Sequence, residues 1–362
     1  MKPPALRLVL LGDGDSPHLL KWARALAAVP DVDLWALSSR GFAPGFDAIL
    51  PTGRRLALGT QPDAAGGNGA LLLQLPRVLR WLRQVQPDWL HAHYLTSHGT
   101  LAWAARKLGR VRARLVGSAW GSDILVTPQR GGAWRWVTRQ VLRDCALATS
   151  DSQVMARRML DLGAGDVMVF PFGLESMPPA APHKDDDLVF ANRGLEPIYA
   201  PDRVLQLFAG LAAGQPALRL VVANDGSLRS ALHAQVQAMG LADRVRFVGR
   251  LDAATQAQWY DRARWYLSLP QSDSVSVSVL EAMAHGCIPI LSDLPANREL
   301  VRHGDNGLIV ADGAALAIDH LYPLRQRADT IASDNRAWVR QHALFGPAVQ
   351  AFVERLRALA PP

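Results

Sequence analysis

Residues 270–289 read PQSDSVSVSVLEAMAHGCIP, a serine-rich turn that joins an apolar stretch to a helical pattern. The apolar stretch Trp265–Leu269 predicts a strand, and the apolar spacing in Val277–His285 predicts a helix. The turn therefore lies at a helix start, where backbone N–H groups lack intrahelical partners and favour an anion such as a diphosphate. We expect these groups to come from Ser274, Val275, Ser276 and Val277.

Two carboxylates flank this turn, Asp273 immediately before it and Glu281 inside the predicted helix. A carboxylate binds sugar hydroxyls by accepting their hydrogen bonds. An acidic pair beside a phosphate-binding turn therefore suits a nucleotide sugar. The spacing alone leaves an alternative open, in which Asp273 only caps the helix and Glu281 is a solvated side chain.

Short apolar strands alternate with amphipathic helices on both sides of this stretch, which predicts an α/β fold with parallel sheets covered on both faces. The pattern starts over once, after the proline-rich stretch 176–187, which we interpret as a linker that includes the solvated acidic run Asp185–Asp187. The predicted strands are Leu6–Leu11, Val32–Leu37, Trp89–His91, Arg114–Val116, Leu188–Ala191, Leu218–Ala223, Val245–Val248, Tyr266–Leu269, Ile288–Leu291 and Gly307–Val310.

Composition narrows the class of protein. A length of 362 residues predicts two domains, and 49% hydrophobic residues exclude a disordered chain. Two cysteines exclude a disulfide framework and a cysteine zinc site, which predicts a cytoplasmic location. The net charge of +7 suits nucleic acid, an anionic membrane surface or a phosphorylated substrate. We exclude nucleic acid as a partner because no recognition motif accompanies the charge.

The motifs and their order resemble the family 4 glycosyltransferases of the GT-B fold, also described as glycosyl transferases group 1. The spacing from Asp273 to Glu281 resembles the E-x7-E motif of that family, here as an Asp-x7-Glu variant. Similar segments occur in both halves of the chain, namely Gly12–Trp22, Asp88–His93, Trp120–Asp123, Phe190–Pro197, Val221–Ser227, Arg244–Leu251, Ser292–Glu299 and Gly304–Leu308.

The resemblance implies two Rossmann-like, doubly wound domains that face each other across a cleft. Residues 1–174 would bind the acceptor and residues 175–338 the nucleotide-sugar donor, while a C-terminal helix within 339–362 would cross back to the first domain. It further implies a retaining glycosyltransferase that needs no metal or other cofactor. Its acceptor would be a glycan or a polyprenyl-linked sugar, as in cell-surface polysaccharide assembly.

The resemblance also assigns roles to residues on the donor side. Arg193 would bind the donor diphosphate, Asp273 the sugar hydroxyls and Glu281 the ribose, and these three form the predicted catalytic set. From the residues alone, Arg193 is alternatively an ion-pair partner of Glu196. Further donor-binding candidates are Gly12, Gly249, Arg250, Ser274, Ser276 and Val277.

Candidates on the acceptor side are His18, His93, Trp120 and Asp123. Each has a structural alternative: a histidine in the first turn of a helix is often a surface residue, and a tryptophan most often fills the core. His91, next to His93, is best interpreted as a buried core histidine.

The chain departs from the family pattern at three places. Asp273 replaces the usual glutamate, Ile198 and Tyr199 occupy the places where a second diphosphate cation is usual, and Trp120 replaces a histidine. These changes keep a second hypothesis open, a catalytically weak or inactive nucleotide-sugar-binding scaffold. A nucleotide-sugar epimerase is a third and weaker one.

Two segments, residues 76–83 and 130–143, combine arginines with tryptophans at helical spacing. Such a face on the first domain can lie on anionic lipid, which predicts peripheral association with the inner membrane face. The alternative is a pair of ordinary amphipathic helices with tryptophan inward and arginine outward.

Overall fold

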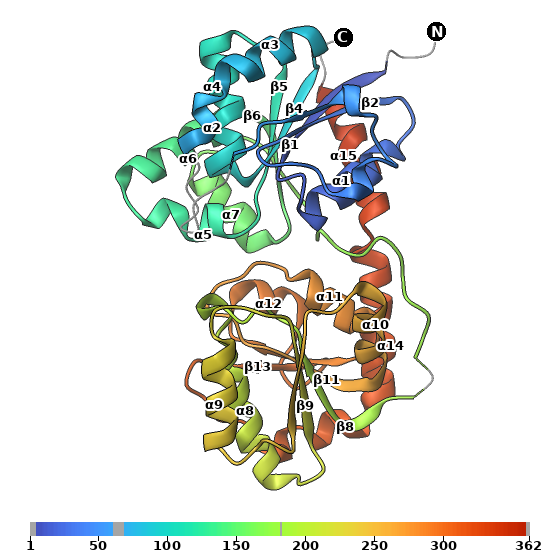
Figure 1. Ribbon diagram of the computed structural model, residues 1–362. Helices are drawn as coiled ribbons and strands as arrows, with labels where there is room; N and C mark the ends of the chain where they lie inside the picture. The colour runs from blue at the N-terminus through green and yellow to red at the C-terminus, as the bar shows by residue number, and fades with distance from the viewer. Residues whose placement is uncertain (1–4, 61–68, 182, 360–362) are drawn as a thin grey trace. The chain divides into compact units, whose positions relative to one another are not determined.

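The computed structural model describes residues 5–60, 69–181 and 183–359. These residues form two compact units (Figure 1). Unit 1 comprises the chain up to Phe170 together with the segment that starts at Phe345, and unit 2 is Pro171–Leu344. The predicted boundaries at 174 and 338 thus fall close to, but not at, the observed ones.

Among the described residues of unit 1, seven parallel strands form one sheet in the order β3-β2-β1-β4-β5-β6-β7. Residues Leu8–Leu11 of the interior strand β1 are apolar and fully buried because both faces of this sheet are covered. The strands are β1 (Leu6–Gly12), β2 (Val32–Ser38), β3 (Arg55–Ala57), β4 (Trp89–His93), β5 (Arg114–Ser118), β6 (Cys145–Ser150) and β7 (Val167–Val169).

The last helix of the chain, α15 (Phe345–Leu359), belongs to unit 1 and packs beside α1 (Pro17–Ala27), as Figure 1 shows in red and blue. Trp22 of α1 is fully buried, with its ring edge-on to Phe345 and Phe352 of α15. The predicted return of the C-terminal helix to the first domain is therefore confirmed.

The other helices of unit 1 in the described residues are α2 (Gly69–Leu73), α3 (Leu75–Val85), α4 (Thr100–Gly109), α5 (Ser122–Leu125), α6 (Gly132–Asp144) and α7 (Gln153–Asp161).

In unit 2 the described residues form a six-stranded parallel sheet in the order β10-β9-β8-β11-β12-β13. Its strands are β8 (Asp185–Ala191), β9 (Arg219–Ala223), β10 (Val245–Gly249), β11 (Ala263–Ser268), β12 (Ile288–Ser292) and β13 (Leu308–Val310). Its helices are α8 (Pro201–Gly214), α9 (Arg229–Ala238), α10 (Ala253–Arg262), α11 (Val277–Ala284), α12 (Pro295–Leu300), α13 (Tyr322–Gln326) and α14 (Ala328–His342).

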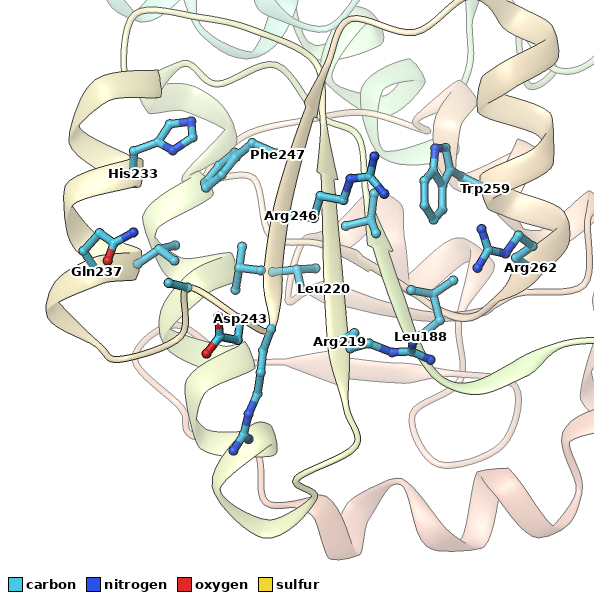
Figure 2. A pocket seen from close by; sticks show the side chains of 15 residues that line it. Leu188, Arg219, Leu220, His233, Gln237, Asp243, Arg246, Phe247, Trp259 and Arg262 are labelled. Atoms are coloured by element: carbon cyan, nitrogen blue, oxygen red, sulfur yellow. The ribbon is translucent and has the colours of Figure 1, made fainter.

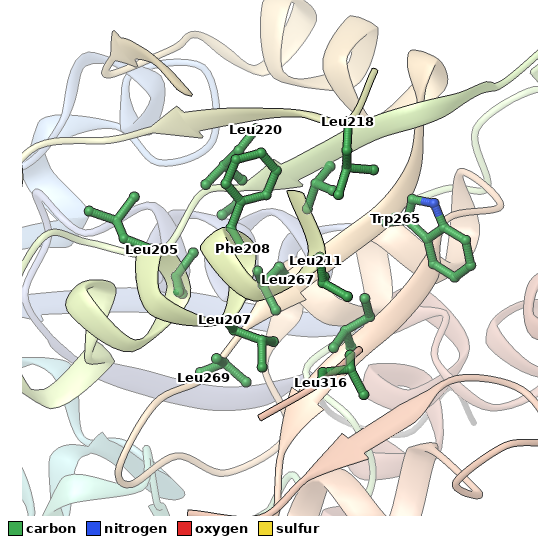
Figure 3. Packing of buried hydrophobic residues seen from close by; sticks show 14 of the residues in the cluster. Leu205, Leu207, Phe208, Leu211, Leu218, Leu220, Trp265, Leu267, Leu269 and Leu316 are labelled. Carbon is green, nitrogen blue, oxygen red and sulfur yellow. The ribbon is translucent and has the colours of Figure 1, made fainter. Parts of the chain in front are cut away.

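Side chains of the unit 2 sheet alternate between two apolar layers. On one face, Leu220 and Leu267 pack against Phe208 and Leu211 of α8 (Figure 3). On the other face, Phe190 and Tyr266 pack with Met283 of α11. A parallel sheet covered on both faces is the doubly wound arrangement predicted from the sequence, and this prediction is confirmed.

The interpretation of Asp185–Asp187 as solvated linker is wrong, because these residues start β8. Asp186 pairs with Arg264 at 2.7 Å and with Arg325 at 3.2 Å. Burial raises the pKa of Asp186, but the two guanidinium groups outweigh that effect and hold the pKa below its usual value. The acidic run therefore forms ion pairs with neighbouring elements of unit 2.

Candidate active site

Two loops meet at the carboxyl end of the unit 2 sheet. Strands β8 and β11 are paired neighbours, with Tyr266 opposite Phe190. Arg193 lies just beyond the end of β8, and the serine-rich turn follows β11 and leads into α11. Because the strands are parallel, both loops emerge at the same edge, where open α/β sheets bind their ligands.

Arg193 makes the contacts that organise this site. Its guanidinium donates to Asp273 Oδ2 at 2.6 Å, to Ser278 Oγ at 3.1 Å and to Ser276 Oγ. It also lies over the ring of Tyr199, 4.5 Å from the centroid. The structure thus brings three predicted site residues together, Arg193, Asp273 and Ser276.

The alternative interpretation, in which Arg193 pairs with Glu196, is wrong, because Glu196 binds Ser227 instead. Its carboxylate accepts hydrogen bonds from the Ser227 backbone N–H at 2.9 Å and from Ser227 Oγ at 2.6 Å. The alternative role of Asp273 as helix cap is wrong as well, since Ser276 occupies the N-cap position of α11.

The Arg193–Asp273 pair is largely removed from water, with side chains 17% and 23% exposed. Burial raises the pKa of Asp273 above its usual value, and Arg193 and the Ser274 N–H offset only part of that rise. Burial lowers the pKa of Arg193, but Asp273 and nearby tyrosines outweigh it and the net pKa is raised. Arg193 therefore keeps its charge in a site that disfavours uncompensated ions.

Glu281 is held by side chains that the sequence analysis did not single out. Its Oε2 accepts from Gln256 Nε2 at 3.2 Å and lies 3.1 Å from the Tyr260 hydroxyl. Asn192 donates to that hydroxyl at 2.7 Å and accepts from Tyr266 at 2.8 Å. These contacts orient the carboxylate, so Glu281 is not a freely solvated helix side chain.

Burial keeps the two tyrosines of this network protonated. It raises the pKa of Tyr266 to about 12 and that of Tyr260 well above its usual value. Both phenols therefore remain neutral hydrogen-bonding groups at physiological pH. Only the position of Asn192 directly before Arg193 could have drawn attention to this network from the sequence.

The first turn of α11 offers backbone donors, with one correction to the prediction. The Ser274 N–H already donates to Asp273 Oδ1 at 3.0 Å, so this group is not free. Within the described part of the chain, the N–H groups of Val275, Ser276 and Val277 have no protein acceptor. A helix start with such donors attracts anions, and Arg193 lies beside it.

Gly249 is the last residue of β10 and Arg250 follows it, at the same edge of unit 2. Gly249 adopts φ +71°, a conformation that favours glycine, and its carbonyl accepts from the Asn224 N–H at 2.6 Å. Asn224 itself has φ +82°, which is unusual for a residue other than glycine. The strained backbone of Asn224, after β9, is typical of functional loops, although a contact of Gly249 or Arg250 with a base stays a prediction.

The predicted acceptor-side residues of unit 1 also meet, at the carboxyl ends of β1, β4 and β5. Trp120 Nε1 donates to His93 Nδ1 at 3.0 Å, and the ring of His18 lies 4.7 Å from that of Trp120. Tyr94 stacks on Trp120 at 5.8 Å and has φ +61°. With His18 and Tyr94 as ring neighbours, Trp120 acts as part of an aromatic cluster.

Asp123 is buried and joins two loops of this cluster. It accepts from the backbone N–H groups of Leu95 and Trp120, each at 2.9 Å. Burial raises the pKa of Asp123, and these N–H groups offset part of the rise. The geometry therefore gives Asp123 a positioning role within unit 1.

The histidines beside this cluster are neutral. Burial lowers the pKa of His91 to about 3 and holds the pKa of His93 well below its usual value. Since Trp120 donates to His93 Nδ1, the proton of this ring lies on Nε2, a buried atom with no partner in the described residues. His91 bonds Ser118 Oγ at 2.6 Å and is a core residue, as predicted.

Gly12 has a packing reason to be glycine. A Cβ atom there would lie 2.5 Å from Leu19 Cδ1, and one at Gly14 would lie 2.5 Å from the carbonyl oxygen of Gly41. Both are contacts inside unit 1, so a role of Gly12 in donor binding stays a prediction.

The basic aromatic helices expose part of their apolar surface. Trp134 and Trp136 of α6 are 38% and 56% exposed, so the alternative in which all tryptophans point inward is wrong for this helix. Trp81 of α3, in contrast, packs edge-on against Trp35. Within the described ranges, no helix combines the length and the apolar character needed to cross a membrane.

No group of three His, Cys, Asp or Glu side chains in the described residues is placed to hold a metal ion. The metal-independent chemistry nevertheless stays a prediction. A cavity of unit 2 lies beside the outer strand β10, and Arg193 is not among the residues that line it (Figure 2). It does not belong to the cluster described above.

Family comparisons cover most of the chain. Residues 7–152 match the family described as "Glycosyl transferase 4-like", and residues 175–329 match "Glycosyl transferases group 1". The structure of Anabaena HepE in complex with UDP is similar, with 18% identity and a TM-score of 0.78 over 98% of this chain and 100% of that one. At this identity the likeness concerns the fold.

Two curated relatives share part of their length with the chain. Phosphatidyl-myo-inositol mannosyltransferase of Mycobacterium leprae is 28% identical over 67% of this chain and 65% of its own length. D-inositol 3-phosphate glycosyltransferase of Jonesia denitrificans is 31% identical over 44% of this chain and 39% of its own length. The chain is thus built from two glycosyltransferase domains in the GT-B fold, a glycosyl transferase 4-like domain followed by a domain of glycosyl transferases group 1.

Proposed function

We propose that the protein is a retaining glycosyltransferase that transfers a sugar from a nucleotide-diphosphate sugar to a hydroxyl of a glycan or lipid-linked acceptor. The observation that carries this proposal is the buried Arg193 beside Asp273 and the open N–H groups of α11. Relatives that are named as glycosyltransferases, and the similar HepE structure with UDP-glucose, support it. A role in cell-surface polysaccharide assembly belongs to the same proposal.

We place the donor on unit 2. Its diphosphate binds Arg193 and the N–H groups of Ser276 and Val277, its sugar hydroxyls bind Asp273, and Glu281 holds the ribose. As the bond between sugar and phosphate breaks, negative charge collects on the departing diphosphate, and Arg193 stabilises that charge. Arg193 already donates a hydrogen bond to Asp273. When the donor binds, its phosphate oxygens share the Arg193 guanidinium with that carboxylate.

We place the acceptor on unit 1, near His93, Trp120 and His18. His93 is neutral, accepts the hydrogen bond of Trp120 and is a poor base, because burial holds its pKa low. The acceptor proton therefore passes to the departing diphosphate in this proposal. No metal or other cofactor takes part.

One observation favours the second candidate, a scaffold that binds a nucleotide sugar without transferring it. Ile198 and Tyr199 occupy the places of the second diphosphate cation, and Tyr199 covers Arg193 with its ring. With one cation instead of two, stabilisation of the leaving diphosphate is weaker. An epimerase is less well supported and would release altered sugar without any acceptor.

A location on the cytoplasmic side, in contact with an anionic membrane, completes the proposal. Trp134 and Trp136 are exposed on α6, and Arg77, Arg80 and Arg83 are exposed on α3. Tryptophan inserts at the headgroup level and arginine binds anionic lipid. The variant W134S/W136S should lose most of its sedimentation with phosphatidylglycerol vesicles, whereas equal sedimentation of both proteins would remove this part of the proposal.

The function is tested by donor hydrolysis and transfer. Purified protein is incubated with UDP-, GDP- and ADP-hexoses, with and without polyprenyl-linked sugars, and the released nucleoside diphosphate is quantified. A transferase releases diphosphate that Glu281→Gln reduces strongly, and the anomeric configuration of the product reports retention. Binding of a nucleotide sugar with no release under any condition would favour the scaffold.

A further inference from the structure

A cavity of about 560 Å³ lies at the outer edge of the unit 2 sheet, beside strand β10 (Figure 2). Side chains of β9, β10, α9 and α10 line it, and β10 is the edge strand because it pairs only with β9 in the described sheet. Arg193, Asp273 and Glu281 are not among the lining residues. A volume of this size is in the range of small-molecule sites, roughly 300–1,000 Å³.

Three arginines from three elements gather on one side of β10 in Figure 2, namely Arg219, Arg246 and Arg262. Arg219 pairs with Asp185 at 2.7 Å. Arg246 and Arg262 have no carboxylate partner among the described residues, although the guanidinium of Arg262 lies 4.9 Å from the centre of the Trp259 ring. Two exposed guanidinium groups without carboxylate partners in one cavity favour an anion that contacts both.

The remaining charged groups of the cavity do not neutralise these arginines. Asp243 is the one lining carboxylate in the described chain, and Figure 2 places it on the α9 side of β10. Arg244 donates to the Ala212 carbonyl at 2.7 Å and is held there. His233 packs on Phe247 with ring centres 4.2 Å apart. The side with Arg246 and Arg262 is therefore strongly positive.

The cationic side also has an apolar wall. Leu188, Val221 and the ring of Trp259 line it together with the arginines. Guanidinium forks match pairs of phosphate oxygens, and a ring or hydrocarbon portion of a ligand gains from apolar contact. This combination differs from the site at Arg193, where a carboxylate already neutralises the cation.

We propose that this cavity is a second anion site of unit 2, which binds a phosphate- or diphosphate-bearing ligand through Arg246 and Arg262 and packs the remainder of the ligand against the ring of Trp259. The ligand is either a free phosphorylated compound or the headgroup of an anionic lipid. The proposal does not depend on donor binding at Arg193.

Pyrophosphate is the probe for a free ligand. The titration uses full-length protein with R193A/D273N, a background in which the candidate active site lacks both its cation and the carboxylate that would be left unpaired. We expect saturable binding of pyrophosphate by calorimetry, weakened at least tenfold by Arg246→Gln or Arg262→Gln added to that background. Arg302→Gln, an exposed arginine elsewhere in unit 2, is the matched control and should leave binding unchanged.

Vesicles of phosphatidylcholine with phosphatidic acid test the lipid source. Sedimentation with these vesicles that Arg246→Gln reduces and Arg302→Gln does not would assign the site to a lipid headgroup, and pyrophosphate binding with the same pattern would assign it to a free ligand. Absence of both, or equal losses in Arg246→Gln and Arg302→Gln, would overturn the proposal. Because the background has no Arg193, none of these outcomes decides donor binding.

Discussion

The two units build different chemistry at the same position of the same architecture. In both, polar residues gather where parallel strands end, but unit 2 buries an ion pair and unit 1 buries neutral rings. Arg193 and Asp273 face each other at 2.6 Å in unit 2, whereas His93 and Trp120 share a hydrogen bond between uncharged groups in unit 1. Under the proposed function, this difference lets unit 2 exchange one anion for another and leaves unit 1 with uncharged groups for hydroxyls and sugar rings.

Removing the guanidinium group of Arg193 should lower the free energy of unfolding more than any other change considered below. Arg193→Ala leaves the Asp273 carboxylate without its cation and with the Ser274 N–H as a remaining donor, which costs roughly 3–5 kcal/mol in the free energy of unfolding. Urea unfolding at neutral pH measures this loss. R193A/D273N should recover a large part of it, because the uncompensated charge is gone. A loss that is equal in both variants would show that the ion pair does not carry the effect.

Acid should weaken unit 1 through its neutral histidines. The pKa of His91 is lowered from 6.5 to about 3 in the folded protein, so its contribution to stability is complete above pH 6.5 and is lost as the pH falls toward 3. Roughly 2 kcal/mol disappears between pH 6.5 and pH 5, at about 1.4 kcal/mol per pH unit.

The measurement is urea unfolding at several pH values, with His91→Asn as the variant and His320→Asn as the control. His320 is exposed in unit 2. The slope of stability against pH should become shallower in His91→Asn alone. An unchanged slope would mean that His91 is not the group that takes up the proton on unfolding.

Removing the carboxylate charge of Asp273 should have a smaller effect than removing Arg193. It should strengthen the binding of a nucleoside diphosphate, whereas removal of Arg193 should weaken it. Asp273→Asn frees Arg193 from its carboxylate, so nucleoside diphosphate should bind several-fold more tightly, on the scale of about 1 kcal/mol. Donor turnover should fall, because the sugar loses a charged acceptor for its hydroxyls. Calorimetry with UDP and GDP checks the affinity, and weaker binding in Asp273→Asn would contradict the exchange of anions.

The smallest expected effect concerns the network behind Glu281. Tyr260→Phe removes the hydroxyl that lies 3.1 Å from Glu281 and accepts a hydrogen bond from Asn192. This loss should lower the free energy of unfolding by about 1 kcal/mol. We expect an increase in the KM for the donor with a smaller change in kcat, because the hydroxyl only orients Glu281. Tyr322→Phe, on the surface of unit 2, is the control. A fall in kcat alone would assign the hydroxyl a direct chemical role.

Much of the fold was predictable because several strands contain short apolar runs. The runs Leu8–Leu11 of β1, Leu188–Ala191 of β8 and Trp265–Leu267 of β11 are buried, as expected for a sheet that is covered on both faces. Strand β3 and strand β7 have three residues each and lie at the edges of the unit 1 sheet, where pairing needs no apolar run. Strand β6 reads CALATS, and its small residues give no clear pattern.

Residues of the candidate site that belong to a sequence motif were predictable. Residues outside any motif, which reach the site only because the chain folds, were not. Arg193 lies 80 residues before Asp273 and 83 before Ser276 in the chain, and they meet because β8 and β11 are neighbours. Gln256 and Tyr260 reach Glu281 from α10, a helix without any motif. Asp185–Asp187 was misjudged because its arginine partners come from later elements.

Calorimetric titration of the wild type and of R193A/D273N with UDP-, GDP- and ADP-hexoses tests whether Arg193 forms a donor site. We predict that one nucleotide sugar binds the wild type and that the double variant, which keeps the fold but lacks the cation, binds it at least tenfold more weakly. Equal binding by both proteins, or no binding of any nucleotide sugar at millimolar concentration, would contradict a donor site at Arg193.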